Sequence, residues 1–126
     1  MILNYSDSKY IVKIQPVYSF WEHHFKAECL TYHTLSHFKI SPDILAGWIT
    51  NEIGYIILER IQGITLKDYL SSRHSLSPAQ LYRLYEKIWS MHRMGIIHGD
   101  LHTNNVNINE LFFLYNYISV YKHYYN

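Results

Sequence analysis

The chain has 126 residues, of which 48% are hydrophobic and 17% are charged, and its formal net charge is +1. This composition is typical of one globular domain and excludes a disordered chain. The near-neutral charge favours neither nucleic acid nor an anionic membrane as a partner, and no apolar run reaches the roughly 18 residues of a membrane span. Because Cys29 is the only cysteine, no intrachain disulfide can form, and we expect an intracellular, cytoplasmic location.

Four strands are predicted, two on either side of a helix. Lys9–Gln15 mixes β-branched residues with lysines and ends at Pro16, and Ile2–Tyr5 precedes it across a turn of serine and aspartate. Asp43–Thr50 and Gly54–Glu59 are two further strands joined by a short turn. Strands joined by such short turns pair in the antiparallel direction.

The segment from Phe20 to about Phe38 has a helical pattern. Its apolar residues recur every three or four positions and so form one stripe on the helix surface. The members of this stripe are Phe25, Cys29, Tyr32 and Leu35. The helix must end before Pro42, because the residue before a proline is driven out of the helical conformation.

A second helix is marked at both of its ends. Ser77, Pro78 and Gln80 form a capping box, with an N-cap serine, a proline in the first turn and a glutamine that reaches back. Gly95 stands where a left-handed residue would end the helix. Its apolar face consists of Leu81, Leu84, Ile88 and Met91. Together with a short helix at Leu66–Leu70, the element order predicts an α+β fold with an antiparallel sheet.

The segment after this helix carries the chemistry. His98-Gly99-Asp100-Leu101 is followed by Asn105, which matches the pattern H-R-D-L-x-x-x-N with glycine in place of arginine. An aspartate in such a loop accepts the proton of an attacking hydroxyl, and an asparagine five residues later reaches a magnesium ion on the nucleotide phosphates. A rigid helix before the loop suits this task, because a positional error of about 1 Å costs rate.

In this loop the sequence resembles the protein-kinase-like superfamily, and its H-G-D-L-H spelling is similar to that of the atypical, RIO-type kinases. Aminoglycoside and choline phosphotransferases have similar loops. The resemblance runs from Lys13 to Asn105 and implies phosphoryl transfer from ATP, with Mg²⁺, to the hydroxyl of a protein serine or threonine. It also implies a two-lobed fold, with an antiparallel N-lobe sheet and helix C, a hinge, and the beginning of a helical C-lobe.

The resemblance assigns further residues to the nucleotide site. Lys13 lies in a strand like that of the V-A-I-K lysine, which neutralises the α- and β-phosphates, and Glu28 in the next helix is its implied partner. Leu58 occupies the gatekeeper position of the hinge. Backbone groups near Glu59 and Ile61 are the implied hydrogen-bonding partners of adenine.

The sequence departs from the family pattern on both sides of these landmarks. No G-x-G-x-x-G loop precedes Lys13, and no D-F-G follows Asn105. The nearest counterpart of D-F-G is Asn116-Tyr117-Ile118, which makes the amide of Asn116 the second metal ligand. Because magnesium prefers anionic oxygen ligands, we expect weak nucleotide binding and very slow transfer.

We therefore expect a single partial kinase-like domain. Residues 1–59 form its N-lobe, residues 60–109 the hinge and the start of a C-lobe with the catalytic loop, and residues 110–126 a divergent aromatic tail. A protein partner would cover the incomplete C-lobe. Two alternatives remain open, namely a catalytically inactive pseudokinase fragment that acts by binding a partner, and a small-molecule phosphotransferase.

Simpler interpretations stand beside these assignments. Asp100 and Asn105 are common turn residues, and Lys13 can be a solvated strand lysine. Glu22 is a rival of Glu28 as the partner of the lysine, because both lie in the same helix.

Four histidines require a decision as well. His98 is assigned to packing, whereas His102 either touches the substrate or faces water. His33 and His37 are four residues apart on a helix, but neither a third ligand nor an H-E-x-x-H pattern accompanies them, so no metal site is expected there.

Overall fold

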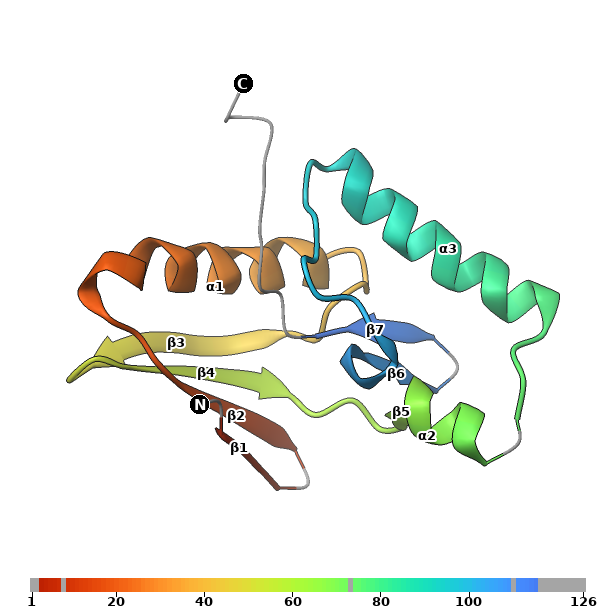
Figure 1. The fold of residues 1–126 in the computed structure, drawn as a ribbon, viewed down its shortest axis with the longest axis horizontal. Coiled ribbons are helices and arrows are strands. Elements are labelled where there is room, and N and C mark those ends of the chain that lie inside the picture. Colours follow the sequence, from red (N-terminus) through yellow and green to blue (C-terminus); the bar gives the residue numbers. More distant parts are fainter. Residues whose placement is uncertain (1–2, 8, 73, 110, 116–126) are drawn as a thin grey trace. The chain divides into compact units, whose positions relative to one another are not determined.

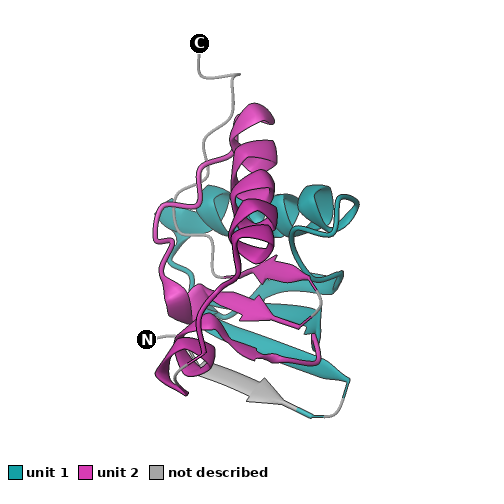
Figure 2. Ribbon diagram, turned by 90° about the vertical axis from the view of Figure 1, so that its right-hand side faces the viewer, with its two compact units in different colours: residues 1–60 teal, residues 61–126 magenta. Residues whose placement is uncertain are grey.

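The structure is a computed structural model that describes residues 3–7, 9–72, 74–109 and 111–115. The chain divides into two compact units, Met1–Arg60 and Ile61–Asn126, which Figure 2 shows in different colours. Each unit has its own antiparallel sheet and at least one helix. Within the described ranges, no helix combines the length and the apolar character that crossing a membrane requires.

The first unit is built on a four-stranded sheet with the strand order β1-β2-β4-β3 (Figure 1). The strands are β1 (Leu3–Ser6), β2 (Tyr10–Pro16), β3 (Ile44–Thr50) and β4 (Ile53–Glu59). All neighbouring strands are antiparallel. The four predicted strands are thus confirmed, with small shifts at their ends.

A tight turn joins β3 to β4. Asn51 and Glu52 have positive φ angles of 51° and 61°, as in a type I′ turn, whose twist matches that of the strands. Gly54 follows at a point of close packing, where a Cβ atom would lie 2.4 Å from the Phe25 ring and 2.7 Å from Val17. Glycine is therefore required here because a helix side chain fills the space beside it.

Helix α1 (Glu22–Ser36) follows a short 3-10 turn, η1 (Ser19–Trp21), and packs against the sheet. It ends before Pro42, as predicted. Its buried residues are Phe25, Glu28, Thr31, Tyr32, Leu35 and Ser36. The predicted stripe is therefore largely confirmed, with Cys29 half-buried at its edge. Glu28 is the one charged residue of α1 that is buried.

The second unit contains a three-stranded antiparallel sheet with the order β5-β6-β7 (Figure 1). Its strands are β5 (Ile64–Thr65), β6 (Val106–Ile108) and β7 (Phe112–Leu114). Its helices are α2 (Leu66–Ser71), α3 (Pro78–Arg93) and the 3-10 turn η2 (Thr103–Asn105). Buried apolar residues of this unit include Leu66, Met91, Ile96, Val106, Ile108, Phe112 and Leu114.

Both ends of α3 were predicted correctly. The Ser77 backbone N–H donates to Gln80 Oε1 at 2.9 Å, and the Gln80 backbone N–H donates to Ser77 Oγ at 3.1 Å. Gly95 has a φ of 79° and ends the helix. On the predicted apolar face, Met91 is buried whereas Leu81 is 57% exposed. Leu84 and Ile88 are half-buried, so within the described residues the burial of this face increases towards the C-terminal end of α3.

Candidate functional site

A buried ion pair joins the centre of the first sheet to helix α1. Lys13 lies in β2 opposite Ile56 of β4, and its ammonium group forms a direct salt bridge with Glu28 Oε2. The side chains are 4% and 7% exposed. Gln15 Nε2 donates to the other oxygen, Glu28 Oε1, at 3.2 Å. The prediction that Lys13 and Glu28 lie within reach of each other is confirmed.

The burial of this pair excludes the simpler interpretation of Lys13 as a solvated strand residue. Removing two charges from water is costly, and their attraction offsets that cost only when the geometry and the additional hydrogen bonds are good. The two donors on Glu28 meet this requirement. Glu22, the rival carboxylate, instead forms an exposed ion pair with Lys26 on α1 at 3.3 Å.

Cys29 follows Glu28 in α1, and its thiol has low reactivity. Burial is the main cause that raises the pKa of the Cys29 thiol to about 11, and the negative charge of Glu28 is the second. The thiol is therefore protonated at neutral pH, and a protonated thiol is a poor nucleophile. Its position next to Glu28 makes it a reporter of the pair and not part of the chemistry.

In the second unit, the loop that follows α3 is held in place by a buried histidine, His98. His98 Nδ1 accepts a hydrogen bond from the Asp100 backbone N–H at 3.1 Å, so Nε2 carries the proton and donates to the Tyr115 carbonyl. His98 is 2% exposed. Gly99 between them has a φ of 89°, a conformation that suits glycine. The predicted packing role of His98 is confirmed.

Asn105 closes the loop onto Asp100. Its amide nitrogen Nδ2 donates to the Asp100 backbone carbonyl at 2.8 Å, and its own backbone N–H donates to the His102 carbonyl at 2.9 Å. The Asn105 side chain is buried, whereas the Asp100 carboxylate is exposed. The loop thus presents a carboxylate to solvent and holds an amide beside it, and the amide oxygen is of the hard type that Mg²⁺ binds.

Curated sequences, among them two kinases, resemble the chain over part of its length, although no protein-family model matches it. Serine/threonine-protein kinase PrkC of Bacillus subtilis is 29% identical over 94 residues, which cover 69% of this chain and 14% of that protein. The probable serine/threonine-protein kinase fnkB of Dictyostelium discoideum is 35% identical over 65 residues, 48% of this chain and 12% of that protein. The chain thus spans a small part of these relatives.

Solved structures resemble the chain over nearly its whole length. A monomeric WbdD structure superimposes with a TM-score of 0.72 and 17% identity, covering 97% of this chain and 33% of that one. A structure of the bifunctional kinase-methyltransferase WbdD gives a TM-score of 0.69 with 16% identity, over 94% of this chain and 30% of that one. The chain has a protein-kinase-like fold. The predicted α+β class with an antiparallel sheet is confirmed.

The predicted hinge of this kinase-like fold begins at the end of β4. Leu58 is buried, and Glu59 is half-buried. The Glu59 backbone N–H donates to the Asp43 carbonyl at 2.9 Å, and Glu59 Oε1 accepts from the Asp43 N–H at 3.0 Å. This N–H is therefore engaged, so an adenine contact at Glu59 would need a different backbone group. Ile61 is half-buried at the start of the second unit.

The remaining assignments of the kinase-like site concern metal ligands. Asn116 and the segment proposed to replace D-F-G lie outside the described residues. In the part of the chain that the structure describes, no three His, Cys, Asp or Glu side chains gather as a metal-binding group. The His33 and His37 rings contact each other edge to face at 5.1 Å, without such a group. The expectation that they bind no metal remains a prediction.

One residue of the loop was left undecided by its sequence. His102 is exposed, and its Nε2 lies 3.5 Å from Asp100 Oδ2. It also lies 3.2 Å from Asn105 Nδ2. The sequence signal for a role of His102 is its position two residues after Asp100. That spacing alone does not tell whether the imidazole ring turns back towards the carboxylate.

Proposed function

We propose that this chain is a kinase-like phosphotransferase that transfers a phosphoryl group from Mg²⁺–ATP to a hydroxyl group. A protein serine or threonine is the proposed acceptor, because both curated relatives carry serine/threonine kinase names. The expected nucleotide residues are Lys13 and Glu28, with Leu58, Glu59 and Ile61 at the adenine end.

The observation that carries this proposal is the buried Lys13–Glu28 pair. Replacing both members of a buried ion pair by well-packed apolar residues is often neutral for stability, so folding alone does not require a charged pair at this position. Holding an ammonium group in place by a carboxylate instead provides a fixed positive charge. Such a charge suits the α- and β-phosphates of a nucleotide, where the family uses this lysine.

The loop of the second unit supplies the reacting groups. Asp100 is the proposed base that accepts the hydroxyl proton, and its exposed carboxylate is accessible to a substrate. Asn105 is the proposed magnesium ligand through its amide oxygen, since its amide nitrogen already donates to the Asp100 carbonyl. When bound, the metal neutralises charge on the phosphates. The exposed carboxylate and the held amide fit such an ion chemically.

A binding assay and a transfer assay test this proposal together. Thermal shift with Mg²⁺–ATP should show stabilisation that Lys13→Met reduces and that the exposed control Lys26→Met does not. Radiolabel transfer to a mixture of protein substrates should be lost in Asp100→Asn and retained in Asp68→Asn, an exposed aspartate of α2. Binding without transfer would favour the pseudokinase, and transfer to small hydroxyl compounds alone would favour the small-molecule enzyme. Turnover that survives Asp100→Asn would refute the assigned base.

A further inference from the structure

His102 is held at one ring nitrogen by the backbone of its own loop. It is the N-cap of η2, and its Nδ1 accepts a hydrogen bond from the Asn104 backbone N–H at 3.2 Å. A backbone N–H can only donate, so Nδ1 carries no proton in this arrangement. A neutral imidazole then has its proton on Nε2. The cap therefore determines the tautomer of the ring.

The protonated Nε2 has two polar neighbours, and one of them can accept its proton. Nε2 lies 3.5 Å from Asp100 Oδ2 and 3.2 Å from Asn105 Nδ2. The Asn105 amide cannot be reversed to offer its oxygen, because that oxygen would then lie 2.8 Å from the Asp100 carbonyl oxygen. Nδ2 is a donor, so its 3.2 Å contact with Nε2–H is between two donors, and Asp100 Oδ2 at 3.5 Å is the acceptor among these two neighbours.

We propose that His102 is a positioning residue that orients the Asp100 carboxylate for proton transfer. This inference depends on the function proposed above. In this proposal the imidazole N–H faces Oδ2, which leaves Oδ1 to accept the proton of the hydroxyl. The present separation of 3.5 Å is longer than an ordinary N–H···O hydrogen bond, and catalytic contacts are often long before a substrate binds and tighten when it does.

Exposure decides what this contact can do. The His102 and Asp100 side chains are 48% and 46% exposed, and exposed pairs add little to stability because water competes with them. Orientation of a reacting group, by contrast, is sensitive to shifts of about 1 Å, which cost up to about a hundredfold in rate. His102 therefore acts on the rate constant kcat and leaves folding and ATP affinity nearly unchanged.

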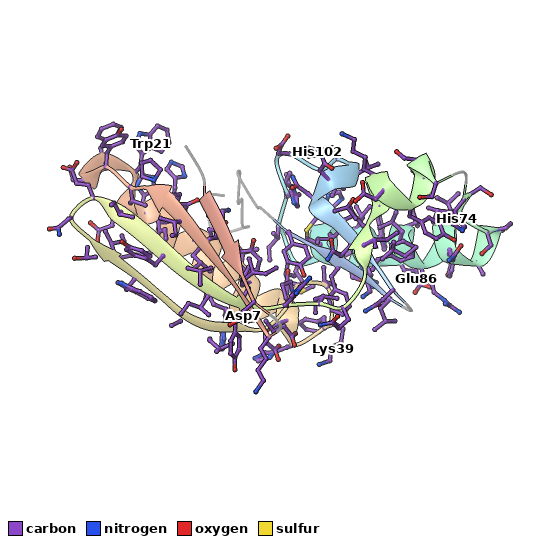
Figure 3. The ribbon with its side chains drawn as sticks, turned by 90° about the horizontal axis from the view of Figure 1, so that it is seen from below. Asp7, Trp21, Lys39, His74, Glu86 and His102 are labelled. Atoms are coloured by element: carbon purple, nitrogen blue, oxygen red, sulfur yellow. The ribbon has the colours of Figure 1, made fainter. Side chains whose placement is uncertain are left out.

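His102 is labelled in Figure 3. Two substitutions separate the positioning role from a purely structural role, in which His102 only caps η2. His102→Asn keeps an oxygen near the position of Nδ1, so the cap survives while the donor to Asp100 is lost. His102→Gln places an amide N–H near the position of Nε2, so the donor is restored. We expect kcat to fall on the order of tenfold to a hundredfold in His102→Asn and less in His102→Gln, with the Kd for ATP unchanged. His92→Gln, an exposed histidine of α3, is the control.

Nitrogen NMR of the histidine rings in the 126-residue chain gives a readout independent of turnover. We expect the His102 signals of an Nε2–H imidazole, and a shift of the Nε2 signal in Asp100→Asn but not in His92→Gln. An Nδ1–H ring, or signals unmoved by Asp100→Asn, would overturn the inference. So would an unchanged kcat in His102→Asn, or a loss that His102→Gln shares equally. If the unmodified chain transfers no phosphoryl group, the proposed function fails, and the NMR result still decides whether His102 contacts Asp100.

Discussion

The two units each pair a basic side chain with a carboxylate, yet in opposite environments. Lys13 and Glu28 are almost fully buried, with a second donor on the carboxylate. His102 and Asp100 are about half exposed and 3.5 Å apart. Burial makes the first pair costly to break, whereas exposure leaves the second weak but free to reach a substrate. The buried pair therefore provides a fixed positive charge in one unit, whereas the exposed pair leaves a carboxylate accessible in the other.

The largest expected effect is on stability when the buried pair is broken. Glu28→Gln leaves the Lys13 ammonium buried without its counter-charge, which should lower the free energy of unfolding by about 3–5 kcal/mol. Urea denaturation measures this loss. Asp100→Asn is the matched exposed change and should stay within about 0.5 kcal/mol of the unmodified chain. Equal effects of the two substitutions would contradict the contrast between the units.

The next effect concerns the packing that surrounds the buried pair. Gly54→Ala would place a Cβ atom 2.4 Å from the Phe25 ring and 2.7 Å from Val17, and both neighbours are buried. We expect a loss of about 1–3 kcal/mol from this overpacking. The thermal unfolding of Gly54→Ala should be compared with that of the double variant Gly54→Ala/Phe25→Leu, in which the smaller leucine leaves space for the added Cβ atom. If the second change fails to recover stability, the steric explanation is wrong.

Local signals in the sequence predicted much of both units. The capping box at Ser77 and Gln80 depends only on residues close together in the sequence, so the start of α3 could be predicted from the sequence. The turn between β3 and β4 was bounded in the same way. Strands β5 and β6 were not predicted, because elements of two and three residues show no periodicity.

The site required information that spacing does not contain. Glu22 and Glu28 both lie near the apolar stripe of α1, so helix periodicity could not choose between them. Only the structure identifies Glu28 as the partner, because it shows a buried salt bridge from Lys13 to Glu28 and an exposed pair between Glu22 and Lys26. The contact of His102 with Asp100 likewise depends on the turn of η2, which brings the ring back over the loop. Motif spacing therefore located the loop and left its geometry open.

A third basic group, Lys87, has an intermediate environment. Its ammonium donates to the Phe112 carbonyl at 2.6 Å and lies 4.7 Å from the centroid of the Phe113 ring. Burial lowers the pKa of the Lys87 amine from 10.5 to about 8. Between these values the unfolded chain binds more protons than the folded chain, so stability should rise with pH across that window.

This pH effect should be small, because Lys87 is partly exposed. We expect a rise on the order of 1 kcal/mol between about pH 8 and 10, after allowance for solvent screening. Urea titrations of the chain and of Lys87→Met across this range measure it, and the rise should be missing from Lys87→Met. Lys67→Met, an exposed lysine of α2, is the control. A rise of equal size in Lys87→Met would assign it to other groups.

The last prediction uses Cys29 as a reporter of the buried pair, and its expected effect is the smallest in free energy. Because the pKa of its thiol is raised to about 11 from 9.0, its thiolate fraction at neutral pH is about a hundredfold lower than that of an ordinary cysteine. Labelling with a thiol reagent should be slowed accordingly, relative to a short peptide with one cysteine. Cys29 is the only cysteine, so the measured rate has one source. In Glu28→Gln the neighbouring negative charge is gone while Lys13 remains, so the pKa should fall and labelling should speed up. An unchanged rate in Glu28→Gln would mean that burial alone raises the pKa of the thiol, and that Cys29 does not sense the charge of the pair.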